Sequence, residues 1–404
     1  MHNQVEESIG SRIASYRKLA GYTQREFAEH SHLSLGNVRK VERGERLPTH
    51  GFLHTTARVL SVSVEELTGQ PYRGRQRADE KAHAPIAAIR SAARAYDLPP
   101  EWRTSLRPLR EIAIDVEEAT RHRAAARYTR LGLLLPELLE ELTAAVNLLD
   151  GDRKRAAAKL LASCYYMAHC LAYRLGYADL AGQLDDRQGW AAGLSGDPLA
   201  VGLSQWSRAG GFQAAREYST GLRLLSRARD QLTERDCSSP SAVTLLGSLH
   251  LREATLASRA RDEQATEHHL AKASLLAGQI PGQVDQVHYH LTFGPANVSL
   301  HDMAAQVELK HPEEAAKRAR GLRLPSSLPH TRRGHYHIDA ARAFLAVGDR
   351  EKALAALQSA RRVAPQQTRY HPMAREAVRV LAGQYRKAGQ DLRTLAAWMG
   401  QDVA

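Results

Sequence analysis

The sequence predicts an all-α fold, in which a headpiece of five short helices precedes a long, irregular array of helical hairpins. Ala, Leu, Arg and Glu dominate the composition while aromatic residues make up only 6 %, so helix formers outnumber strand formers. From residue 105 onward, apolar residues recur at helical spacing almost without interruption. The 404 residues suffice for two or three domains with a large core.

The formal net charge of +12 favours polyanionic partners but does not specify a fold. Residues 1–80 contain 12 Lys or Arg against 10 Asp or Glu, and residues 81–130 contain 10 against 6. The headpiece is therefore only mildly basic, and charge by itself does not identify its function.

The chain has three cysteines, Cys164, Cys170 and Cys237, a sparse and odd set that forms no disulfide framework and matches no zinc signature. We expect Cys164 and Cys170 to be core or near-core residues of one helix. The N-terminus lacks the pattern of a signal peptide, and no apolar run approaches the ~18 residues that a membrane span needs. These features predict a cytoplasmic protein.

Five helices are predicted in the headpiece, residues 6–70, because inward-facing positions recur at three- and four-residue spacing. These positions are Ile9, Ile13, Tyr16, Phe27, Ala28, Ser31, Val38, Val41, Phe52, Leu53, Thr56, Ala57 and Leu60. Thr23–Glu26 and Ser63–Glu66 have the capping-box pattern, and Ser34 can cap the third helix. Gly21 and Gly44 supply C-terminal stops. A short turn between the second and third helices is typical of helix-turn-helix geometry.

The segment GSRIASYRKLAGYTQREFAEHSHLSLGNVRKVERGERLP resembles the phage-repressor/Cro-type (XRE) headpiece. The matching features are Arg17 with Thr23 and Gln24, the small Ala28, and the run from Val41 to Pro48. The resemblance covers about 60 residues. It implies a bacterial regulator that binds a double-stranded DNA operator and is nucleoid-associated when bound.

In that geometry the third helix enters the major groove by its N-terminal half. Its expected outward positions are Leu35, Gly36, Asn37 and Lys40. We expect Asn37 to bond an adenine edge, Lys40 a guanine, and Leu35 a thymine methyl, while Gly36 lets the backbone come close. The family usually has polar residues at the positions of Leu35 and Gly36, so this protein would depend more on DNA shape.

Phosphate contacts are expected from four further residues. The family pattern places Gln24 at the start of the second helix, where its side chain and the helix N-terminus meet a phosphate. The candidate phosphate clamps are Arg17, Arg43 and Arg46.

Residues 71–104 are predicted to be a linker with a short helix from Ile86 to Tyr96. The stretch Pro71–Arg77 carries three arginines, so a basic arm along DNA phosphates is the alternative to a plain linker. The run Asp97–Pro100 should end the helix, because proline lacks a backbone donor.

The remaining segment, 105–400, fits stacked helical hairpins. Turn residues precede an alanine by five positions at Gly176/Ala181, Gly210/Ala215, Ala260/Ala265, Lys310/Ala315 and Gly348/Ala353. The intervals between them are unequal, so the array is irregular. It resembles the degenerate tetratricopeptide region of actinobacterial XRE regulators in Arg127–Pro136, Leu175–Ala181, Phe293–Val298 and His337–Phe344. Such regions join subunits or sense a peptide or small molecule.

Catalytic and metal chemistry is not predicted. The His-x-His pairs His288/His290 and His335/His337 and the adjacent His268-His269 lack further ligands at fixed spacing. No phosphate-binding or nucleophile motif occurs in a suitable strand context. We expect a protein that is not an enzyme and has no cofactor or metal.

The candidate effector residues are Asn297, His301, Asp339 and Arg342. Pro295 should break a helix next to Asn297 and expose backbone groups to a ligand. Asp339 and Arg342 lie three apart on one helix face and could hold a carboxylate or amide. The alternative is that these residues form buried hydrogen bonds between two repeats.

Together these features predict a sequence-specific DNA-binding transcription regulator that acts as a homodimer, with a helical domain that dimerises and/or senses an effector. The alternative is an interaction scaffold whose helical domain recruits a partner protein while the headpiece anchors it to DNA. An antitoxin-like or phage-immunity role is a third hypothesis.

Overall fold

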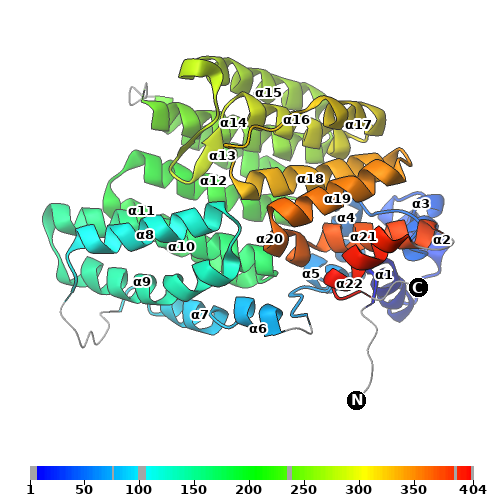
Figure 1. The fold of residues 1–404 in the computed structure, drawn as a ribbon, viewed down its shortest axis with the longest axis horizontal. Coiled ribbons are helices and arrows are strands. Elements are labelled where there is room, and N and C mark those ends of the chain that lie inside the picture. The colour runs from blue at the N-terminus through cyan, green and yellow to red at the C-terminus, as the bar shows by residue number, and fades with distance from the viewer. Residues whose placement is uncertain (1–6, 75–76, 99–105, 234–238, 386–388, 402–404) are drawn as a thin grey trace. The chain divides into compact units, whose positions relative to one another are not determined.

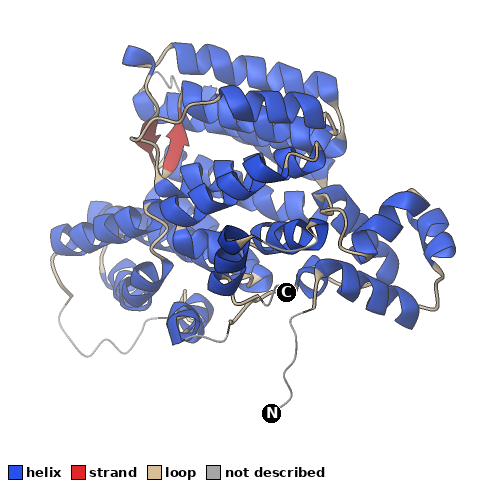
Figure 2. Cartoon of the chain, turned by 45° about the vertical axis from the view of Figure 1, so that its right-hand side comes forward, coloured by secondary structure: helices blue, strands red, loops and turns tan. Residues whose placement is uncertain are grey.

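The computed structural model describes residues 7–74, 77–98, 106–233, 239–385 and 389–401, and they are almost wholly helical (Figure 2). Among these residues, no helix is both long and apolar enough to cross a membrane. Cys237, Arg75 and Pro99–Pro100, which the sequence analysis named, lie outside the described residues.

The chain forms two compact units that do not follow chain order. The first joins the described residues of 1–75 to those of 303–323 and 332–404. The second contains 76–302 and 324–331. The predicted headpiece, residues 6–70, falls within the first unit, whereas the predicted helical domain, 105–400, contributes residues to both units.

The headpiece consists of five helices, as predicted. They are α1 (Ile9–Leu19), α2 (Gln24–Ser31), α3 (Leu35–Glu42), α4 (His50–Leu60) and α5 (Val64–Thr68). Both predicted capping boxes form, at Thr23/Glu26 and Ser63/Glu66. In each box the carboxylate accepts a backbone hydrogen bond from the capping residue, which lowers the pKa of Glu26 and of Glu66. Phe27, which is fully buried, lies in the core between the helices.

The remaining helices of the first unit come from the C-terminal part of the chain. They are α17 (Pro312–Gly321), α18 (His330–Ala346), α19 (Arg350–Val363), α20 (Pro365–Tyr370), α21 (Pro372–Gln384) and α22 (Gln390–Trp398), with the end of α16 (Pro295–Leu309). Met373 of α21 belongs to the hydrophobic core of the headpiece. Tyr72 is also held here, because its hydroxyl donates to the Met399 carbonyl at 3.1 Å and the Arg375 guanidinium lies 3.4 Å from its ring centroid.

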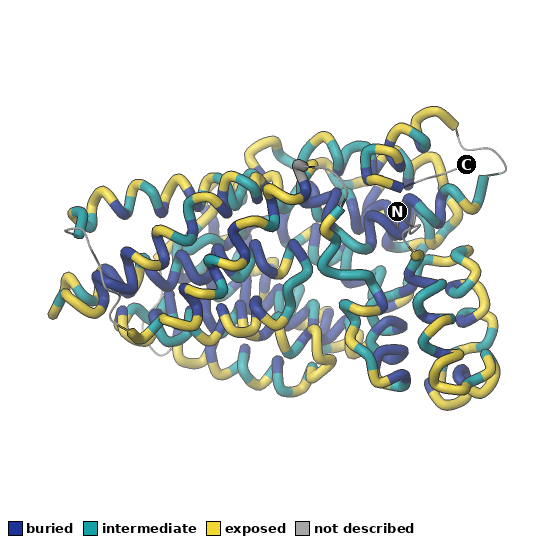
Figure 3. Tube along the Cα trace, turned by 90° about the horizontal axis from the view of Figure 1, so that it is seen from below, coloured by how far each residue is buried: buried dark blue, intermediate teal, exposed yellow. Residues whose placement is uncertain are grey.

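The second unit is built mainly from helices, and its successive long helices lie side by side in Figure 1. The helices are α6 (Arg77–His83), α7 (Ile86–Arg94), α8 (Leu109–Ala124), α9 (Tyr128–Leu148), α10 (Gly151–Leu175), α11 (Ala178–Ser195), α12 (Pro198–Ala215), α13 (Tyr218–Thr233), α14 (Pro240–Ala260) and α15 (Glu263–Gly278). Each long helix packs on its successor from α8 to α15, which gives a solenoid-like stack. The buried residues form a stripe along each helix (Figure 3).

Part of the predicted linker is folded. The predicted helix after Ile86 is present as α7, and a further helix, α6, precedes it. Both pack on α9. Ile86 and Ile89 are buried, so this segment contributes to the core of the second unit. As expected, Cys164 is fully buried on α10 and Cys170 is partly buried.

Four of the five predicted turns are present. Helices end within two residues of Gly176, Ala260, Lys310 and Gly348. The turn predicted at Gly210 is wrong, because α12 continues through this residue to Ala215. A glycine inside a helix is tolerated when the rest of the turn favours the helix.

A short β-hairpin, which the sequence does not predict, leads into the segment Phe293–Val298, where we expect a helix to break. The hairpin consists of β1 (Gln286–His288) and β2 (Leu291–Phe293), which pair antiparallel, and it is preceded by η1 (Pro281–Gln283), a 3-10 turn. Phe293 is fully buried against α14, where a Cβ on Gly247 would lie 1.9 Å from its ring. Pro295 begins α16 rather than kinking a continuous helix, since proline fits the first helical position.

Candidate nucleic-acid interface

The helix-turn-helix pair is fixed by local capping and by a small core. The Thr23 box starts α2, and His32 ends it in the left-handed conformation, with φ 52°. The Ser34 side chain then accepts a hydrogen bond from the Asn37 amide and starts α3. Val38 and Val41 are buried on the inner side of α3, which leaves the opposite side of the helix toward solvent.

Most of the predicted base-contacting residues lie on or next to that outer side. Gly36 and Lys40 are exposed, and a Cβ on Gly36 would meet nothing within 4 Å. Asn37 is partly buried, and its Oδ1 accepts a hydrogen bond from Arg46 Nη1 at 3.3 Å. Leu35 is also partly buried and packs against the headpiece core. Its side chain is therefore shared between the core and the surface.

Arg17 is not available as a phosphate clamp, and this prediction is wrong. Its guanidinium is buried and forms a two-point ion pair with Glu42, with Nε–Oε1 2.6 Å and Nη2–Oε2 2.9 Å. Its Nη1 also donates to the Tyr22 carbonyl at 2.7 Å. These three hydrogen bonds connect α1 to α3 and to the residues just before α2. We call Arg17 a strut, because its side chain holds these segments together and is not free to bind DNA.

The other predicted phosphate contacts lie closer to the surface. Gln24 is partly buried, and its side-chain amide donates to Glu42 at 2.8 Å, so it is oriented by the same strut. Arg43 is exposed and pairs with exposed Glu45 at 2.9 Å. Such a pair contributes little in water. Arg46 is exposed beside Asn37.

Two exposed arginines were missed by sequence reasoning. Arg39 lies on α3 between the predicted positions, and Arg25 lies in the first turn of α2. Arg39 follows Gly36 by three residues, so helical spacing places both on the same face. That spacing was the signal available in the sequence.

The headpiece is braced by a distant helix of its own unit. Glu376 of α21 is buried, and its Oε2 accepts a hydrogen bond from the Ile9 amide at 3.2 Å, across 367 residues of sequence. Ile9 is the first residue of α1, so this carboxylate satisfies an end amide of the helix and faces the positive end of its dipole. Arg379 pairs with the same carboxylate oxygen at 3.2 Å.

The candidate effector residues are buried or bonded within the protein. Asn297 is buried in the second unit, where its side chain donates to the Thr292 carbonyl at 2.7 Å. His301 Nδ1 lies 3.2 Å from the Thr255 hydroxyl. In the first unit, buried Arg342 pairs with Asp339 and Glu308, both at 3.0 Å. These contacts agree with the structural alternative, because a ligand would have to displace them.

Comparisons with known proteins match the headpiece. Residues 8–68 match the family model described as a helix-turn-helix domain. The HTH-type transcriptional regulator YazB of Bacillus subtilis is 43 % identical over 61 residues, which are 15 % of this chain and 88 % of YazB. The phage CTXphi transcriptional repressor RstR of Vibrio cholerae is 39 % identical over 62 residues, 15 % of this chain and 55 % of RstR.

Among solved structures, the crystal structure of Bacillus thuringiensis PlcR with the peptide PapR7 and DNA is similar to 68 % of this chain and 95 % of that chain. The sequence identity is 17 % and the TM-score is 0.25.

The capped α2–turn–α3 pair and the matched residues define a helix-turn-helix DNA-binding domain. The chain belongs to the helix-turn-helix transcriptional regulators, since it covers most of YazB at 43 % identity.

Proposed function

We propose that this regulator recognises a specific operator by placing α3 in the major groove. The single observation that carries the proposal is the two-sided character of α3, which buries Val38 and Val41 and leaves Gly36, Arg39 and Lys40 exposed. Long basic side chains on such a face are suited to guanine edges, and the small Gly36 lets the helix approach the bases.

Affinity would come mainly from phosphate contacts around that helix. Arg43, Arg46 and Arg25 are exposed near the ends of α2 and α3, and the first amides of α2, which begins at Gln24, have no acceptor within the helix. Because few side chains are placed to bond bases, part of the specificity would depend on DNA shape.

We further propose that the regulator acts as a homodimer and that its helical region joins subunits, senses a peptide or small molecule, or does both. The contacts of α21 support a coupling of this kind. Met373 lies in the headpiece core and Glu376 holds the first amide of α1, so a displacement of α21 would act directly on the headpiece. Coupling requires an effector that favours one arrangement over the other.

The scaffold hypothesis stays as an alternative, in which the helical region recruits a partner protein. A pull-down from lysate with and without operator DNA distinguishes the scaffold hypothesis from the sensor hypothesis. Capture of a protein partner that does not depend on the operator favours the scaffold. Operator affinity that responds to a peptide or small molecule favours the sensor.

The DNA proposal is tested by Lys40→Ala and Arg43→Ala, after genomic footprinting by immunoprecipitation has identified an operator. Lys40→Ala should cost about 1–3 kcal/mol on the operator and less on random DNA, because it removes a base contact. Arg43→Ala should weaken both alike and flatten the salt slope by about one, because it removes a phosphate contact. The measurement is fluorescence anisotropy at several salt concentrations.

Arg58→Ala, on the exposed side of α4, controls for the loss of one positive charge and should change affinity little. If Lys40→Ala lowers the affinity for operator and for random DNA equally, Lys40 does not contact a base. No preference of the wild-type protein for any sequence would overturn the proposal.

A further inference from the structure

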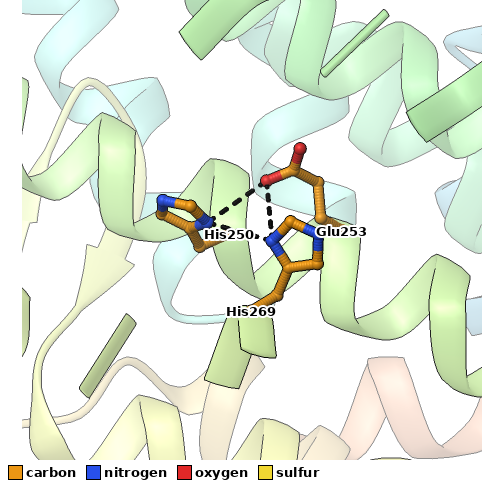
Figure 4. A group of neighbouring side chains, drawn as sticks. All are labelled: His250, Glu253 and His269. Atoms are coloured by element: carbon orange, nitrogen blue, oxygen red, sulfur yellow. Dashed lines mark hydrogen bonds and ion pairs between the residues drawn. The ribbon is translucent and has the colours of Figure 1, made fainter. Parts of the chain in front are cut away.

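Three metal-ligating side chains converge between α14 and α15, away from the DNA-binding helices in sequence. They are His250 and Glu253 on α14 and His269 on α15 (Figure 4). The two Nδ1 atoms lie 3.1 Å apart. Glu253 Oε2 lies 3.3 Å from the Nδ1 of His250 and 3.2 Å from that of His269. The three atoms therefore form a nearly equilateral triangle.

The dimensions of this triangle match a metal site. Zinc binds imidazole nitrogen at about 2.0–2.1 Å and carboxylate oxygen at about 2.0–2.2 Å in tetrahedral geometry, which separates neighbouring ligand atoms by about 3.3 Å. An ion beyond the plane of the triangle would contact all three atoms without moving the helices. The fourth position would stay open to water or to a donor atom of a ligand.

The Glu253 carboxylate gives an independent reason to expect a cation. Its side chain is 2 % exposed, and Oε2 accepts no hydrogen bond from any described residue. The nitrogens around it lie within 3.5 Å but are not aligned as donors. A buried carboxylate oxygen without a hydrogen bond carries a large desolvation cost. A bound cation removes that cost.

The two histidines are also suited to ligation. Each neutral ring can carry its proton on Nε2, which leaves a lone pair on the Nδ1 atom that faces the other two ligand atoms. Neutral imidazole is the form that binds metals.

We propose that His250, Glu253 and His269 bind one Zn²⁺ ion, which would fasten α14 to α15. The sequence predicts no metal site here, since the three residues match no short motif. His250 and Glu253 share a helix face at a spacing of three, but only packing of α15 brings His269 to them. The proposal is independent of how the headpiece binds DNA.

Arg229 of α13 is the group that competes with the ion. Its Nε lies 3.5 Å from the same Glu253 oxygen, and its side chain is 27 % exposed. The guanidinium can therefore turn toward solvent when the ion binds. Arg229→Gln should raise the affinity for Zn²⁺, because it removes a positive charge beside the site.

The full-length protein, stripped with a chelator, is titrated with Zn²⁺ against a chromophoric competitor and, separately, with Co²⁺, whose visible absorption reports tetrahedral coordination. We expect one ion per chain and a higher Tm with metal. Glu253→Gln and His269→Ala should each weaken binding at least tenfold and abolish the cobalt spectrum. His268→Ala is the matched control, since His268 is the exposed neighbour of His269, and it should bind as the wild type does.

Unchanged stoichiometry and affinity in both Glu253→Gln and His269→Ala would overturn the proposal, as would the absence of stoichiometric binding by the wild type. Far-UV circular dichroism of the metal-free variants checks their fold. If Glu253→Gln does not fold, His269→Ala decides the question, because that side chain is the most exposed of the three.

Discussion

At the scale of residues, arginine occurs in two different environments in the first unit. Arg17 and Arg342 are buried, and each is paired with carboxylates inside the protein. Arg39 and Arg43 are exposed on or beside α3. Taken alone, the residue type does not distinguish a strut from a DNA contact. Burial makes the difference, since an internal guanidinium is stable only when its charge is paired.

This contrast predicts unequal stability effects for two matched substitutions. Arg17→Met should lower the free energy of unfolding by about 3–5 kcal/mol, because it leaves the buried Glu42 carboxylate without its main partner. Arg43→Met removes an ion pair to Glu45 whose side chains are 59 % and 49 % exposed, and should cost at most about 1 kcal/mol. Urea unfolding measures both, and equal effects would contradict the assignment of Arg17 as a strut.

At the scale of elements, two glycines of the headpiece, Gly10 and Gly36, differ in how they affect helix packing. Gly10 lies where α1 meets α3, and a Cβ there would be 2.2 Å from the Val41 carbonyl oxygen. Gly36 lies in the first turn of α3, where a Cβ would meet nothing within 4 Å. The first glycine permits close helix packing, whereas the second has no packing role inside the chain.

Alanine at these two positions should therefore have opposite effects on stability. Gly36→Ala should raise the free energy of unfolding by about 0.5–1 kcal/mol, because alanine is the better helix former. Gly10→Ala should lower it by about 1–3 kcal/mol, because α1 must move away from α3. Thermal unfolding tests both. If the backbone of α3 approaches DNA, Gly36→Ala should also weaken operator binding although the protein is more stable; unchanged binding would count against that approach.

At the scale of the whole molecule, the C-terminal helices pack in the same compact unit as the N-terminal headpiece. The last helices share a compact unit with the headpiece, through Met373, Glu376 and the contact of Tyr72 with Met399. Residues near the C-terminus thus support the first helix and the segment that follows the headpiece. In the coupling that we propose, a change in the C-terminal helices would reach the headpiece through these contacts rather than along the chain.

We expect two chains on each operator. One headpiece covers about half of a site, and the second half-site lies about one DNA turn, roughly 34–36 Å, away. Light scattering of the protein–operator complex should therefore give the mass of two chains per duplex, and a duplex with one half-site should bind more weakly. A single chain both free and on the full operator would refute the dimer.

The helices of the headpiece and most of the helical array can be predicted from the sequence alone. The capping boxes at Thr23 and Ser63, the buried Val38 and Val41 and the turn at Gly176 follow from interactions three to five residues apart, which sequence spacing records directly.

The tertiary structure decided what depends on partners far away in sequence. It buried Arg17 against Glu42, placed Glu376 at the first amide of α1, and brought His269 to His250 and Glu253. It also carried α12 past Gly210. The physical reason is the same in each case. Sequence spacing does not distinguish among the many distant residues that could become partners, and tertiary packing selects one of them. Only the folded chain shows which polar side chains are buried and therefore need hydrogen-bond partners within the protein.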